Sequence, residues 1–143
     1  FMEVCRWIIA NTDSGAAFIQ PTYIQEFRGC AQRQGFLSAK HDGIFASFDR
    51  RFGAIFLKRF LDIHKGLTID DLPELQKSPD DKFKAYNLLR AKYLSLSENQ
   101  IEKLKGNYLG YDFFLTELSH NLPYPIVYQN SYFILYDIKN NPR

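Results

Sequence analysis

The last strand-like segment of the sequence, from Tyr132 to Ile138, restricts the fold more than any other feature. In an extended strand, alternate side chains point to opposite faces. One face of this segment carries Tyr132, Ile134, Tyr136 and Ile138, and the other carries Phe133, Leu135 and Asp137. Because both faces are largely apolar, both must be covered. Such a strand belongs to a sheet with a packed layer on either side.

This strand lies in an aromatic-rich final third of the chain. Residues 125–128 form a second strand-like run, and Gln129-Asn130-Ser131 supplies a tight connection between the two. The pattern predicts an antiparallel hairpin at the C-terminal end. Residues 111–118, which are apolar and bounded by turn residues, predict a further strand.

The first part of the chain alternates helical and strand-like patterns instead. Residues 2–10 predict a helix, and residues 16–20 predict a buried strand that ends at Pro21, because proline cannot donate to a central strand. Residues 27–34 predict a second helix and residues 36–39 a second strand. We therefore predict an α/β fold with a mixed sheet, parallel in its first part, closed by the antiparallel hairpin and flanked by helices.

Three longer helices are expected between these parts. Residues 44–64 carry apolar side chains at steps of three or four, which make one apolar face. We expect this face to pack on the sheet. The alternative is a helix lying on a membrane surface, since it is rich in phenylalanine and also carries Arg50, Arg51, Lys58 and Arg59. Ser78-Pro79 and the capping-box pattern Ser97-Glu98-Asn99-Gln100 predict two further helix starts.

Composition limits the classes of protein to which the chain can belong. Its 143 residues, 45% of them apolar, suit a single domain spanning residues 1–143. A formal net charge of +2 gives no field that would attract nucleic acid, which we exclude as a partner. No apolar run is long enough to cross a bilayer. The first residue is Phe rather than Met, so we expect that a segment upstream has been removed.

Cysteine and histidine usage argues against metal or redox chemistry. Cys5 and Cys30 do not form a C-x-x-C motif, although a disulfide between them stays open. His41, His64 and His120 are far apart and lack the spacing of zinc ligands. We expect no metal and no cofactor.

Both ends of the sequence resemble one family. The opening EVCRWIIANTDSGAAFIQP resembles the soluble C-terminal portions of polytopic bacterial membrane proteins, and Phe27-Arg28, Arg33 and Lys40 look like the spaced Phe-Arg, Arg and Lys that follow in that family. The closing LPYPIVYQNSYFILYDI is similar to the end of many GT-C-type membrane glycosyltransferases and their uncharacterised relatives. The resemblance covers the two ends well and the middle poorly.

The resemblance implies a location and a role. The chain would be an extracytoplasmic domain whose transmembrane helices lie upstream of Phe1. In such glycosyltransferases the reactive centre lies in membrane-proximal loops, so the domain itself is expected to be non-catalytic and to act in structure or recognition. Its implied partners are the transmembrane part of its own parent chain and an anionic or lipid-linked sugar ligand.

Five residues are the candidates for ligand binding. They are Arg28, Arg33, Lys40, His41 and Asp42. Ligands of open α/β sheets bind beyond the carboxyl ends of parallel strands, where the residues after the second predicted strand would lie. Guanidinium and ammonium groups suit a phosphate or a carboxylate. The competing interpretation, which we favour, is that Arg28 and Lys40 pair with Asp42, Asp49 or Glu117 and only hold loops in place.

A free-standing hydrolase-like α/β enzyme is the alternative function. His41 next to Asp42 would act as a general base in it. The sequence has no G-x-S-x-G elbow, and Cys30 lies in an apolar helix where a packed thiol is expected. We therefore assign no catalytic residue.

Overall fold

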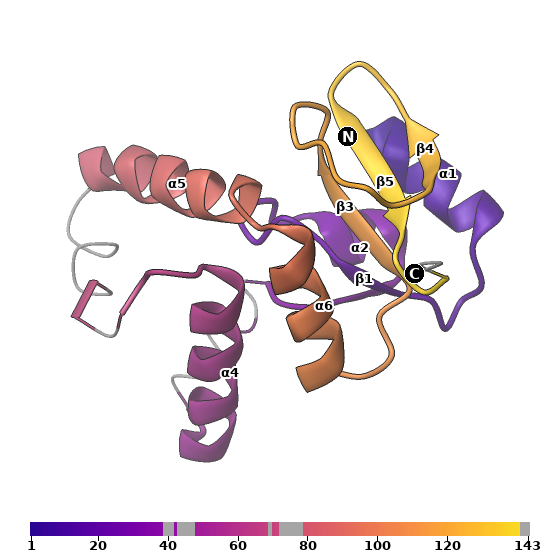
Figure 1. The fold of residues 1–143 in the computed structure, drawn as a ribbon. Helices are drawn as coiled ribbons and strands as arrows, with labels where there is room; N and C mark the ends of the chain where they lie inside the picture. The colour runs from indigo at the N-terminus through magenta and orange to yellow at the C-terminus, as the bar shows by residue number, and fades with distance from the viewer. Residues whose placement is uncertain (39–41, 43–47, 69, 72–78, 141–143) are drawn as a thin grey trace.

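A mixed sheet of five strands lies at the centre of the fold (Figure 1). The structure, a computed structural model, describes residues 1–38, 42, 48–68, 70–71 and 79–140. The strands are β1 (Ala17–Ile19), β2 (Gln34–Gly35), β3 (Phe113–Glu117), β4 (Ile126–Gln129) and β5 (Phe133–Asp137). Their order is β2-β1-β3-β5-β4, with β1 parallel to β2 and β3, and β5 antiparallel to β3 and β4. The predicted fold class and C-terminal hairpin are confirmed.

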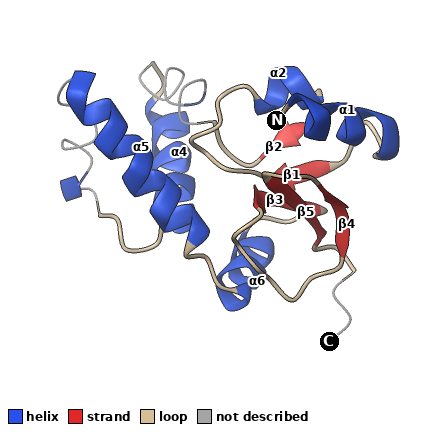
Figure 2. Ribbon diagram, turned by 90° about the horizontal axis from the view of Figure 1, so that it is seen from above, coloured by secondary structure: helices blue, strands red, loops and turns tan. Residues whose placement is uncertain are grey.

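Helices cover both faces of this sheet. They are α1 (Met2–Asn11), α2 (Phe27–Ala31), α4 (Arg50–Ile63), α5 (Pro79–Leu94) and α6 (Glu98–Asn107). Figure 2 shows α1 and α2 on one side of the sheet and α6 on the other. The sheet thus lies between α1 and α2 on one face and α6 on the other, while α4 and α5 extend to the side of it in both views.

The alternation of side chains in the strands explains this layering. Leu115 and Leu135 are fully buried against α1 and α2. Phe114, Ile134 and Tyr136 point the other way and join the larger core, to which α4, α5 and α6 contribute. The prediction that both faces of the last strand are covered is therefore confirmed.

The structure corrects the predicted ends of α2 and β2. The helix ends at Ala31 rather than Gln34, because Gln32 adopts the left-handed conformation with φ of 51° and closes the last turn. The strand is Gln34–Gly35 rather than residues 36–39. Past Gly35, Phe36 N donates both to the Phe18 carbonyl at 2.8 Å and to Gln20 Oε1 at 2.9 Å. Gln20 Nε2 donates to the carbonyl of Leu37 at 2.7 Å, so a side chain takes over the pairing there.

The long helix α4 packs on the rest of the protein through only half of its length. It begins at Arg50, because Asp49 is extended and its carboxylate caps the first turn, so the start predicted at residue 44 is wrong. Residues 44–47 lie outside the described residues. Phe60 and Ile63 are buried in the core. Ile55, one and a half turns closer to the N-terminal end, is 54% exposed. The expectation that the apolar face packs on the core therefore holds only for the C-terminal half.

The remaining helices follow the sequence signals. The helix after Pro79 extends to Leu94, and the capping box of Ser97 and Gln100 opens α6 as predicted. Within the described ranges, no helix combines the length and apolar character that crossing a bilayer requires.

Candidate functional site

Arg28 and Asp42 are the sequence candidates that the structure brings together. Arg28 donates from Nη1 to Asp42 Oδ1 at 2.7 Å and from Nη2 to Oδ2 at 2.9 Å, the two-pronged geometry that suits a carboxylate. Ser38 N donates to the same Oδ2 at 2.7 Å, and Arg28 also reaches the carbonyl of Gly35. Asp42 is only 7% exposed. This pair ties the chain after β2 to α2, as the loop-holding interpretation expects for Arg28.

Arg33 lies in a different environment. Its Nε donates to Thr12 Oγ1 at 3.1 Å, and its Nη2 donates to the carbonyls of Thr12 and Ile9 at 2.7 and 3.2 Å. These carbonyls belong to the C-terminal end of α1, where cations bind the groups that lack helical partners. Thr12 precedes β1 and Asp42 follows β2. Because β1 and β2 are parallel, these two residues lie at opposite ends of the strands, and the structure does not bring Arg33 to the Arg28–Asp42 pair.

The other two candidates, Lys40 and His41, lie outside the described residues. Their part in ligand binding, and that of His41 as a general base, stays a prediction. Both oxygens of the neighbouring Asp42 carboxylate already accept hydrogen bonds, from Arg28 and from the backbone. The carboxylate therefore has a structural use in this conformation.

A small cavity lies beside the pair, between it and α4. Its volume is about 80 Å³, and it is lined by Arg28, Leu37, Asp42, Phe52, Ile55, Phe56 and Arg59. Two guanidinium groups and one carboxylate thus meet among apolar walls. Burial raises the pKa of Tyr111, while the charges of Arg59 and Arg28 act to lower it, so both guanidinium groups lie within electrostatic reach of that buried ring.

Arg59 is the site residue that the sequence analysis missed. Its guanidinium carbon lies 5.2 Å from the ring centre of Tyr108 and 5.6 Å from that of Phe36. Nη1 makes one long contact of 3.5 Å with the carbonyl of Phe36, and Nε is buried with no hydrogen-bond partner among the described residues. The sequence feature that could have identified Arg59 is its spacing of four residues from Ile55, which places both side chains on the same face of α4.

His64 is a buried structural group. It has no exposed surface, and its Nδ1 lies 2.8 Å from the carbonyl of Phe60. Since a carbonyl only accepts, Nδ1 carries the proton, and Nε2 accepts from the Thr22 hydroxyl at 2.6 Å. Burial lowers the pKa of His64 to about 4, so the ring is neutral at pH 7.

His120 repeats this arrangement on another part of the sheet. Its Nε2 donates to the carbonyl of Leu96 at 2.8 Å, and its Nδ1 accepts from the Thr116 hydroxyl at 2.9 Å. Burial lowers its pKa as well. Both described histidines therefore use their ring nitrogens to join core elements.

A closed polar cluster occupies the carboxyl ends of β1 and β3. Strands β2 and β3 lie on opposite sides of β1, and at such a switch point α/β sheets commonly bind ligands. Here Glu117 accepts from Tyr23 Oη at 2.7 Å and from both Nε and Nη2 of Arg90. Burial acts to raise the pKa of Glu117, but the hydrogen bonds from Arg90 and Tyr23 outweigh it and lower the pKa. The partner of Glu117 is thus Arg90, not Arg28, and the acid group is saturated.

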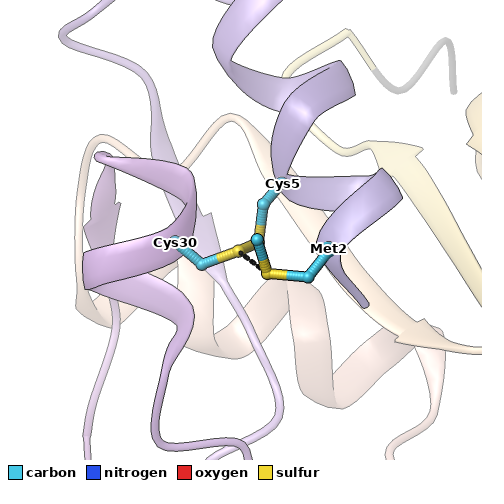
Figure 3. Close-up of a disulfide and its surroundings, with 3 residues drawn as sticks. All are labelled: Met2, Cys5 and Cys30. Atoms are coloured by element: carbon cyan, nitrogen blue, oxygen red, sulfur yellow. Dashed lines mark hydrogen bonds between the residues drawn. A yellow bond between two sulfur atoms is a disulfide. The ribbon is translucent and has the colours of Figure 1, made fainter.

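Cys5 and Cys30 form a disulfide, which the sequence had left open. Figure 3 shows the bond joining α1 to α2, with the Met2 sulfur 3.5 Å from Cys30 Sγ. The two cysteines are 25 residues apart in sequence. The bond therefore links the two helices that cover one face of the sheet.

The described residues contain no group of three His, Cys, Asp or Glu side chains arranged to hold a metal ion. Comparison of the chain with protein-family models, with curated proteins and with solved structures finds no match.

Proposed function

We propose that this chain is a non-catalytic, extracytoplasmic domain of a multi-pass bacterial membrane protein. It packs against the transmembrane part of its own parent chain and recognises an anionic ligand. The resemblance of the two ends to GT-C-type proteins supports a parent that acts in glycosyl transfer.

The observation that carries the proposal is the disulfide between Cys5 and Cys30. Disulfides persist in oxidising compartments and are rare where glutathione and thioredoxin keep thiols reduced. Closing a loop of 25 residues is worth about 3 to 4 kcal/mol in the chain-entropy treatment, so the fold gains much of its stability from the bond. A domain that depends on a disulfide to this extent suits the extracytoplasmic side.

The saturation of the polar groups supports a non-catalytic role. Among the residues that the structure describes, His64 and His120 hold their protons in bonds to buried carbonyls, and Asp42 and Glu117 are bound by arginines. A general base needs a free acceptor within reach of a substrate proton. None of these four groups offers one.

An exposed apolar surface supports packing against a larger partner. Phe83 on α5 is 70% exposed, and Tyr86, three residues further along the same helix, is 43% exposed. Contiguous exposed apolar groups of this kind mark interaction surfaces. In this proposal the transmembrane part of the parent covers them.

Thiol accessibility in cells tests the location. In spheroplasts that express the parent protein, Cys5 and Cys30 are expected to resist a membrane-impermeant maleimide until an impermeant reductant is added from outside. Cys5→Ser provides the control, because it leaves the half-buried Cys30 thiol free to react without reduction, whereas Cys5 is buried. Thiols that are free before reduction, or that react only after lysis, would refute the extracytoplasmic assignment.

Ester hydrolysis tests the alternative enzyme. The purified chain is expected to hydrolyse p-nitrophenyl acetate no faster than a mixture of its free amino acids, with no change in His41→Ala. A turnover that disappears in His41→Ala and in Asp42→Asn would instead establish the hydrolase.

A further inference from the structure

Arg59 carries a positive charge for which the described residues provide no counter-charge. Arg28 is neutralised by Asp42, and Asp49, beside Phe52, accepts hydrogen bonds from the backbone at the start of α4. The cavity next to α4 therefore holds two guanidinium groups against one carboxylate. The described residues that line it thus carry a net charge of about +1, which matches a singly charged anion.

The hydrogen-bond donors of the cavity are also in excess. Each guanidinium has five N–H groups. Arg59 uses one of them in a long contact with Phe36, and its Nε is buried without a partner in the described part of the chain. Arg28 uses three, two on Asp42 and one on Gly35. An unsatisfied buried donor is rare in folded proteins and calls for an explanation such as an ion.

The size of the cavity limits what part of a ligand it can hold. Small-molecule sites usually measure about 300 to 1,000 Å³, whereas this cavity measures about 80 Å³. It admits a charged group of a few atoms and excludes a sugar ring. The rest of the ligand must lie outside.

A second hollow adjoins the small cavity. Its volume is about 470 Å³, and it shares Asp42 and Phe52 with the small cavity while adding Phe48 and Asp49. Phe48 and Phe52 give it an aromatic wall. An apolar chain attached to the charged group fits this surface because its burial there removes apolar area from water.

We propose that the two hollows together bind an anionic amphiphile, with a singly charged oxyanion against Arg59 and an apolar chain along Phe48 and Phe52. The oxyanion is the carboxylate or phosphodiester group of a larger molecule. This inference rests on the recognition role of the proposed function and gives it a ligand class. Arg59 provides the main donors, and the N–H groups that Arg28 does not use on Asp42 and Gly35 provide the rest.

Titration of octanoate and dibutyl phosphate into the 143-residue chain tests this. Isothermal calorimetry gives the affinity, and a shift of the NMR signal of the Arg59 Nε–H reports binding at this guanidinium in the wild type. We expect saturable binding with a dissociation constant below about 10 mM. We also expect Arg59→Gln to weaken it about tenfold or more, the usual cost of losing a charge-assisted hydrogen bond. Arg51→Gln is the matched control, because Arg51 is an exposed arginine on the same helix.

Different ligands distinguish the contribution of the charged head group to binding from that of the apolar chain of the ligand. A stronger response to octanoate than to dibutyl phosphate assigns a carboxylate, and the reverse assigns a phosphodiester. Phe48→Ser is expected to weaken octanoate binding and leave acetate binding unchanged. If Arg59→Gln fails to fold, Arg59→Lys, which keeps the charge and loses the planar fork, is expected to weaken binding less than tenfold.

Several results would overturn the inference. They are an absence of saturation with either amphiphile, an Arg59 Nε–H signal that does not move, or equal affinities in Arg59→Gln and Arg51→Gln. In that case Arg59 only stacks on Phe36 and Tyr108. Such a failure would leave the thiol experiment untouched, so the two proposals are tested separately.

Discussion

Acid should destabilise this protein through His64 before the carboxylates titrate. The ring is fully buried between Thr22 and Phe60, and burial lowers its pKa to about 4. In the unfolded chain the pKa of histidine is about 6.5. Because the folded pKa is the lower one, the unfolded state takes up the proton first, and stability decreases as the pH falls from about 6.5 to about 4.

The size of the effect follows from the two pKa values. A shift from 6.5 to about 4 corresponds to about 3 kcal/mol of unfolding free energy, of which about 2 kcal/mol is lost between pH 7 and pH 5. The pKa values of Glu117 and Asp62 are also lowered, but these carboxylates destabilise the fold only as the pH falls below their ordinary pKa values of 4.5 and 3.8. His120, with its lowered pKa, adds to the loss in the same direction as His64, so a variant is needed to separate the two.

Urea unfolding of the disulfide-intact chain at pH 5, 6, 7 and 8 provides the measurement. We expect the wild type to lose about 2 kcal/mol more than His64→Gln between pH 7 and pH 5, since glutamine does not titrate. Equal pH dependence in the two proteins would refute the argument. NMR titration of the wild-type ring gives a second check that needs no variant, and a pKa of 6 or higher for His64 would also refute it.

Two further predictions concern the packing of the sheet. Leu135→Ala, at a fully buried position against α1 and α2, should lower the free energy of unfolding by about 2 to 5 kcal/mol. Tyr132→Ala, at an exposed position, should change it little. Equal effects of the two substitutions would contradict the layered core. Cys30→Ser should lower it by about 3 to 4 kcal/mol, and reduction of the wild type with dithiothreitol should produce the same loss. A reductant that leaves the melting temperature unchanged would show that the bond contributes nothing.

Local patterns predicted the layers of this fold because they depend on neighbouring residues. The alternation around Leu135 defines two faces whatever the rest of the chain does, and Ser97 with Gln100 caps α6 through bonds within four residues. The position of β2 depends instead on Gln20, whose side chain bonds to Phe36 and Leu37. A partner 16 or 17 residues away leaves no mark on the local pattern.

The candidate site was only partly predictable for the same reason. Arg28 and Asp42 lie on segments that follow parallel strands, so their meeting was expected from topology. The spacing of Arg59 from Ile55 does not show whether this side chain points to solvent or to the core, and only its packing on Phe36 and Tyr108 shows that it faces inward. The partner of Glu117 was also missed, because Arg90 comes from a helix whose sequence does not indicate which face meets the sheet.

The distribution of arginine partners explains why ligand binding would move away from the switch point. Arg90 neutralises Glu117 between the ends of β1 and β3, and Arg33 binds the end of α1, so neither offers a free fork to a ligand. Arg59 alone among these described arginines lacks a strong acceptor, and it lies at the β2 edge next to the exposed half of α4. An anion at the switch point would have to displace Glu117, whereas one beside Arg59 displaces nothing charged. An anion therefore binds at the edge of the sheet with a smaller loss of stabilising ion pairs than at its centre.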